Sequence, residues 1–253
     1  MKIILQILLT LCFTYSIIAK EAGETEITTD DGIEVFQNEK YYLLKKNVNI
    51  VSDNFNLRAD NVKINFDKSL YDIIELNAKG NVSFESNELS IRGSGESLRF
   101  EVLIENIKVE GIKSNLKTED VEMFSDGFIE VNNLTGSFLL NGMNSKLINK
   151  NIVIEGESID GIFSKNTINK EISFLDVFDK KISYVKNNDT EMYAKKIKFN
   201  NDDSIIELID NVTIIRNGEN ITGDYGTLDT KKNSYKIKSN NKTKVKVIIQ
   251  NDE

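Results

Sequence analysis

Residues able to do chemistry are scarce in this chain of 253 residues, and their absence excludes whole classes of site. The chain contains no His, so neither a Ser-His-Asp triad nor a His-ligated metal site can form. The one Cys, Cys12, lies in an N-terminal apolar run, so the rest of the chain has no disulfide or thiol chemistry. Acidic residues outnumber basic ones, 40 to 32, which argues against a nucleic-acid partner.

The remaining polar motifs do not build a catalytic or metal site. Asp30-Asp31 and Asp202-Asp203 are carboxylate pairs, but they lack the ligand spacing of a calcium loop and lie in turn-like stretches. Gly93-Ser94-Gly95 lies between two strand-like segments and does not open a helix, as a phosphate-binding loop would. We therefore expect no catalytic residue, no cofactor and no metal, and a protein that works through its surface and shape.

The N-terminus has the features of a secretory signal. A basic Lys2 is followed by the apolar residues 3–18 and a small residue, Ala19. We predict a signal peptide over 1–19 and a flexible acidic lead over 20–32, which places the protein in the periplasm. An uncleaved membrane anchor is the alternative, because Ile17 is an imperfect residue for a cleavage site.

From Ile33 to residue 250 the chain alternates apolar and polar residues with a period of two. Val62-Lys63-Ile64-Asn65-Phe66 is one such run, and Asn, Asp, Gly or Ser residues separate it from the next. This pattern, together with many Ile, Val and Phe and no Pro, predicts short β-strands joined by polar turns. The exception is the segment from Glu171 to Tyr184, in which a helical turn is compatible with the pattern.

An internal repeat runs through the same region. An Asn-Val pair is followed nine residues later by an aliphatic residue, as from Val82 to Ile91 and from Val212 to Ile221. Asn before Val is compatible with the positive φ of a tight turn, so each copy predicts a β-hairpin. The better-formed copies occupy 47–100 and 194–250, and an irregular insertion is expected at about 166–192.

Two segments carry a family resemblance. Residues 57–100 (LRADNVKINF…LNAKGNVSF…LSIRGSGESLRF) and 194–237 (AKKIKFNN…LIDNVTII…ITGDYGTLDT) resemble the OstA-like repeat of lipopolysaccharide-transport proteins, a family that includes LptA, LptC and the N-terminal domain of LptD. The resemblance implies one all-β domain over 33–250. Its form would be an open twisted β-jellyroll, or β-solenoid-like roll, of antiparallel strands built from repeated hairpins.

The resemblance also implies a ligand, namely the acyl chains of lipopolysaccharide in an apolar groove inside the roll. The same residues would form an ordinary packed core if the roll were filled. The candidate lining residues are the inward-facing apolar side chains of the repeats, namely Val48, Ile50, Leu57, Ile64, Phe66, Leu76, Val82, Phe84, Ile91, Phe100, Ile197, Phe199, Leu208, Val212, Ile214 and Ile221.

The two ends of the roll are candidate partner surfaces, because an unpaired edge strand is a template for another strand. Ile33 and Val35 mark the first edge, and Val245, Val247 and Ile249 mark the last. The alternating Lys242, Lys244 and Lys246 fit edge protection, and contact with lipid phosphates is a second reading.

These features predict a non-enzymatic periplasmic carrier that binds lipopolysaccharide and passes it toward the outer membrane. Its expected partners are other OstA-like or Lpt proteins, or further copies of the chain joined head to tail through the edge strands, and no nucleic acid. Two alternatives stay open. One is an LptC-like component anchored in the inner membrane, and the other is a structural or adhesive β-solenoid with a filled core.

Overall fold

The computed structural model describes residues 24–164, 171–240 and 244–249. The predicted all-β fold is confirmed, since the described residues form strands and one 3-10 helix, η1 (Val102–Ile104). The strands are β1 (Glu26–Thr28), β2 (Gly32–Phe36), β3 (Tyr41–Val51), β4 (Phe55–Phe66), β5 (Ile73–Ser86), β6 (Ile91–Glu101), β7 (Asn106–Glu110), β8 (Ser114–Lys117), β9 (Val121–Ser125), β10 (Phe128–Asn132), β11 (Ser137–Asn149), β12 (Ile152–Phe163), β13 (Ile172–Asn187), β14 (Thr190–Asn200), β15 (Ile205–Arg216), β16 (Glu219–Asp229), β17 (Ser234–Lys238) and β18 (Lys246–Ile249).

Within the described ranges, no helix has the length and apolar character that crossing a membrane requires. The predicted signal peptide at 1–19 lies outside the described residues.

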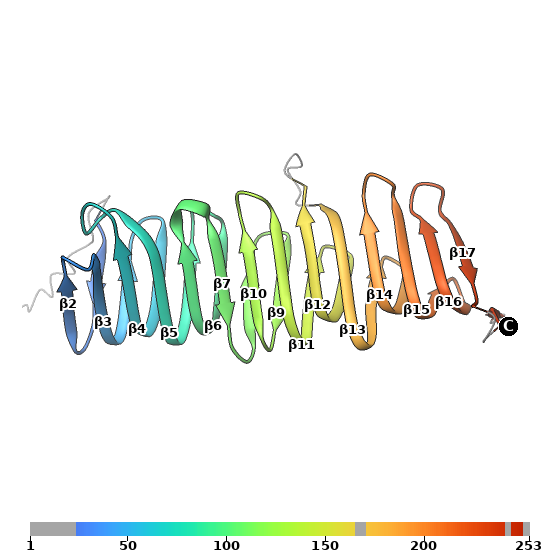
Figure 1. Ribbon diagram of the computed structural model, residues 1–253, viewed down its shortest axis with the longest axis horizontal. Coiled ribbons are helices and arrows are strands. Elements are labelled where there is room, and N and C mark those ends of the chain that lie inside the picture. Colours follow the sequence, from blue (N-terminus) through green and yellow to red (C-terminus); the bar gives the residue numbers. More distant parts are fainter. Residues whose placement is uncertain (1–23, 165–170, 241–243, 250–253) are drawn as a thin grey trace, which may run out of the picture.

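The strands form an antiparallel meander that advances along the long axis of the molecule (Figure 1). Most long strands change register in the middle, for example between Lys45 and Val48 of β3, and there the strand passes from one layer to a second. Layer A contains β2, β7, β10, β17 and one half of each long strand. Layer B contains β1, β8, β9, β18 and the other halves. We call the side of the molecule where the strands cross between layers the bend edge.

At several bends an acidic residue contacts a left-handed bulge or turn of the neighbouring strand. In β5 the bulge consists of Gly80 and Asn81, with φ of 78° and 48°. Asp60 of the neighbouring β4 stands opposite this bulge, and its carboxylate accepts a hydrogen bond of 2.9 Å from the Asn81 amide. Gly and Asn are the residues that adopt positive φ at least cost, so the local sequence permits the bend.

Acidic side chains accept hydrogen bonds from neighbouring segments at other points along the bend edge. The acidic residue and its donor are Asp30 with the Asn47 amide, Asp60 with the Asn81 amide, Glu96 with the Ile112 N–H at 3.2 Å, Asp126 with the Asn144 amide at 2.8 Å, and Asp224 with the Asn240 N–H at 2.7 Å. The positive φ predicted for the Asn of the Asn-Val pairs is therefore confirmed at Asn81 and Asn211. These residues lie at the bend of a strand and not in a tight turn, while the chain reverses in the hairpins at 87–90 and 217–218.

The apolar core lies between the two layers. One continuous cluster of buried side chains extends from Tyr42 in β3 to Leu228 in β16. Alternate residues of each strand contribute to it, as in β4, where Leu57, Val62 and Ile64 are each about 1% exposed. The predicted period of two thus describes the inner and outer faces of both layers.

The structure corrects two predictions about irregular segments. Part of the expected flexible lead at 20–32 is β1, which pairs with β3 in layer B. Much of the expected insertion at 166–192 is β13, a strand of 16 residues that pairs with β12 and β14, and no helical turn occurs in it. The reason is the bend of β13, where residues 179–182 lie outside the register with β14 and interrupt the alternation.

We predict that Asn81→Val destabilises the fold. A β-branched residue at φ 48° is strained, and the hydrogen bond to Asp60 is lost, so the free energy of unfolding should fall by about 1–2 kcal/mol. Urea unfolding measures this change. The matched control is Ser83→Val at an exposed, extended position of the same strand, which should shift stability by less than about 0.5 kcal/mol. Equal losses in both variants would contradict the proposed role of the bulge.

Candidate functional site

Opposite the bend edge, the hairpins of the two layers face each other across a mouth. The hairpin at 133–136 belongs to layer A, and the hairpins at 118–120 and 150–151 belong to layer B. Two cavities open between the layers at this mouth. The C-terminal cavity has a volume of about 400 Å³ and the central cavity about 370 Å³. Both lie within the range of about 300–1,000 Å³ that small-molecule sites occupy.

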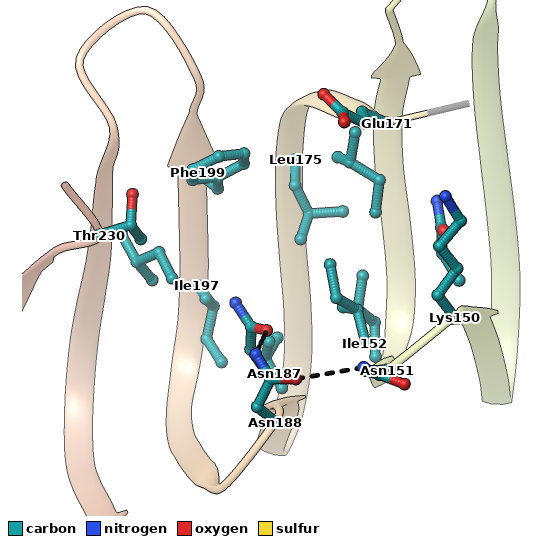
Figure 2. Close-up of a pocket in the computed structure, with 15 residues that line it drawn as sticks. Lys150, Asn151, Ile152, Glu171, Leu175, Asn187, Asn188, Ile197, Phe199 and Thr230 are labelled. Atoms are coloured by element: carbon teal, nitrogen blue, oxygen red, sulfur yellow. Dashed lines mark hydrogen bonds between the residues drawn. The ribbon is translucent and has the colours of Figure 1, made fainter. Parts of the chain in front are cut away.

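The floor and walls of the C-terminal cavity are apolar and mostly aliphatic. Inward-facing residues of four consecutive strands supply them, and side chains from three of these strands surround the same space in Figure 2. They are Ile152 and Ile154 of β12, Ile172, Leu175 and Val185 of β13, Ile197 and Phe199 of β14, and Ile206 of β15. Strand alternation places most of these side chains on the inner face. Ile172 lies three residues before Leu175, and a register shift at Phe163 accompanies its inward position.

Polar residues form the rim of this cavity. The Asn151 amide donates to Asn188 Oδ1 at 3.3 Å, and the Asn188 amide donates to Asn187 Oδ1 at 3.2 Å, so a chain of amides joins two hairpin tips (Figure 2). Lys150 and Glu171 add one charge of each sign. The site is thus apolar inside and rich in hydrogen-bonding groups at its opening.

The central cavity follows the same plan one section earlier along the axis. Leu116, Val121, Met123, Val131 and Phe163 provide apolar walls. Polar rim groups come from both layers and are Thr118, Asn132, Asn133 and Ser164.

This arrangement suits an amphipathic ligand with a hydrocarbon part. Each methylene that leaves water for such a lining contributes about 0.8 kcal/mol, and the rim amides can bind a polar head group. Within the described residues no cluster of three or more Asp, Glu, His or Cys could hold a metal ion.

The predicted lining residues all occur in strands, and the structure separates them by burial. Fourteen of the sixteen are buried in the core, while Phe100 and Phe199 are only partly buried. The members that line a cavity at the mouth are Ile91, Ile197 and Phe199. Residues such as Leu208 and Val212 lie beside a bend, where the layers converge and no space remains.

The sequence analysis missed most of the cavity walls. Ile152 and Ile154 belong to an alternating run, but they lie outside the better-formed repeats. Ile172, Leu175 and Val185 fall in the segment expected to be an insertion, so they were not considered as lining residues. The alternation of Leu175 and Val177 was the signal that could have found Leu175, whereas Ile172 faces inward at a register shift that alternation does not predict.

The predicted edge residues lie at the two open ends of the roll. Ile33 and Val35 pair with the buried Leu44 and Tyr42, so they face the core side, yet they are 49% and 45% exposed. At the other end Val247 pairs with the buried Ile221 and is 53% exposed. Lys242 lies outside the described residues. Each end therefore exposes apolar side chains that continue the row of core residues.

The outer face of layer B differs from this interior. Tyr184 and Tyr193 pack with ring centroids 5.0 Å apart, and Lys186 and Glu191 form an ion pair of 3.0 Å beside them. Burial and a hydrogen bond to Glu191 raise the pKa of Tyr193 to about 12. Aromatic and charged side chains thus mix on the outside, while the groove is almost purely aliphatic.

Comparisons with known proteins found similarity for part of this chain. Residues 26–127 match the model of a family described as LptA/(LptD N-terminal domain) LPS transport protein, which confirms the family resemblance over that segment. None of the curated proteins matches the chain. A solved structure of LptH from Pseudomonas aeruginosa, described as the LptA-homologous periplasmic component of the lipopolysaccharide transport device, is 15% identical with a TM-score of 0.42. The alignment covers 52% of this chain and 95% of LptH.

The outer tyrosine pair yields a pH prediction. The pKa of Tyr193 is higher in the folded state than its ordinary value of 10.0, so the folded state favours the protonated phenol. This stabilisation is complete below pH 10 and disappears as the pH rises through about 12. Urea unfolding across this pH range should show a smaller loss of stability in Tyr193→Phe than in the unchanged chain. An equal loss in both would contradict the assignment.

Proposed function

From the match of residues 26–127 to the LptA/LptD N-terminal family of lipopolysaccharide-transport proteins, we propose that this chain is a non-enzymatic periplasmic lipid carrier. It holds acyl chains of lipopolysaccharide between its two layers and passes them toward the outer membrane. The observation that carries the proposal is the aliphatic C-terminal cavity with its amide rim at the mouth of the roll.

The geometry of the mouth supports an amphipathic cargo. A hydrocarbon chain that enters between the hairpins meets Ile172, Phe199 and Ile206, while its head group stays at the level of Asn151 and Asn188. The cavity is open to solvent along the mouth, so the head group need not be desolvated. The net negative charge of the chain favours binding through the acyl chains over binding of an anionic head group.

The ends of the roll support assembly with similar domains. A neighbour whose edge strand pairs with β18 or β2 covers Val247 or Ile33 and extends the apolar interior. The partner is another OstA-like protein or a second copy of this chain.

A filled-core structural role is the second candidate, and one observation favours it. In the section from β3 to β6, aromatic side chains pack in pairs inside the roll. The ring centroids of Tyr42 and Phe66 are 6.2 Å apart, and those of Phe55 and Phe100 are 6.4 Å apart. If the whole interior stayed dry, the roll would serve as a rigid spacer without cargo.

Photo-crosslinking distinguishes the two candidates. A photoreactive amino acid at Phe199, which lines the C-terminal cavity, should crosslink to lipopolysaccharide in cells. The matched control is the same amino acid at Lys198, the residue just before Phe199 in β14. Its side chain lies on the outer face and should give no adduct. Equal adducts at both positions, or none at either, would contradict the carrier proposal and favour the filled roll.

The edge proposal has a separate test. Val247→Lys places a charge on the core side of β18, which should weaken strand addition at this end. Analytical ultracentrifugation should then show less concentration-dependent association than for the unchanged chain. Ile248→Lys puts the same charge on the outer face of the same strand and should leave association unchanged. Identical behaviour of the two variants would argue against assembly through β18.

A further inference from the structure

Strand β11 separates the two cavities. Three of its inward-facing residues, Phe138, Leu140 and Leu147, are at most 2% exposed and line neither cavity, while Asn149 at the end of the strand borders the C-terminal cavity. Buried side chains of β11 therefore lie between the two cavities and keep them separate. A section with a fully packed core thus lies between two sections that contain cavities.

The strand register locates both sides of this section. Across layer B, Leu147 of β11 lies between Met123, which lines the central cavity, and Ile154, which lines the C-terminal cavity. Across layer A, Phe138 pairs with Val131 of the central cavity. Phe163 of β12 pairs with Ile172 of the C-terminal cavity and itself lines the central one.

Two aromatic rings form the part of this section that lies in layer A. The centroids of Phe138 and Phe163 are 4.4 Å apart. Phe138 is held in place because Gly161 leaves room for its ring, where a Cβ would collide with it. The Phe163 N–H donates to the carbonyl of Gly136 at 3.0 Å, which fixes the backbone of Phe163 but leaves its side chain beside the mouth.

We propose that Phe138, Leu147 and Phe163 form a partition that divides the groove into two acyl-chain compartments. Phe163 is the residue that moves when a chain passes from one compartment to the other. Its ring already borders open space on the side of the central cavity, whereas Phe138 and Leu147 are enclosed. This inference rests on the proposed lipid-carrier function and specifies how many chains the groove holds and where.

The partition predicts a limit on chain length. Binding of saturated fatty acids from decanoate to docosanoate is measured with the purified chain, below their critical micelle concentrations. Affinity should rise about fourfold for each added methylene while the chain fits one compartment, and then stop rising. Native mass spectrometry should detect two short-chain ligands bound per protein.

Phe163→Ala should remove the limit. The compartments then join, so affinity continues to rise with chain length and one long chain replaces two short ones. The matched control is Phe66→Ala, which shortens an inward aromatic residue far from both cavities and should keep the original limit. Fluorophores on Leu134→Cys and Asn151→Cys, each in a Cys12→Ser background, report the central and C-terminal cavities separately.

The outcomes separate this inference from the function on which it rests. If fatty acids bind but affinity rises steadily to the longest chain, or if Phe163→Ala keeps the limit, the partition is wrong and the carrier proposal stands. If no fatty acid binds, both are wrong. If Phe163→Ala does not fold, the length limit and the two-ligand stoichiometry of the unchanged chain still test the partition. Absence of both would overturn it.

Discussion

The bends of the long strands determine the form of the whole molecule, and at several of them an acidic side chain contacts a left-handed segment of the next strand. Without the bends, the meander would be one long sheet with both apolar and polar faces in water. Where Asp60 faces Gly80 and Asn81, β4 and β5 bend so that the inner face of one half of each strand looks toward the inner face of the other half. Acidic residues occupy similar places at other points along the bend edge. The buried core, the mouth and the two open ends all follow from this repeated bend.

The distance from the bend edge decides what an inward residue does. Leu208 and Val212 flank the bend of β15, where the layers are close, and they pack as ordinary core residues. Phe199 and Ile91 lie near hairpin tips, where the layers have separated, and they line cavities. One pattern of alternating apolar residues therefore supplies packed core at one edge and cavity lining at the other.

This dependence explains how far the sequence could be interpreted. Alternation identified the inner face correctly, and the Asn-Val repeat marked bends at Asn81 and Asn211. Alternation carries no information about the separation of the layers, so core and cavity residues could not be distinguished. The cavity walls in β13 were lost for another reason, since the unpaired residues 179–182 made a regular strand resemble an insertion.

The meander makes the length of the roll independent of its cross-section. Each long strand from β12 to β15 pairs with its two neighbours in the chain, so one more hairpin there would extend the molecule without altering the bends or the mouth. Two strands add about 10 Å along the axis. The length of the molecule thus changes in steps of one hairpin. Gain or loss of a single hairpin would therefore change the length of the molecule and leave its cross-section unchanged.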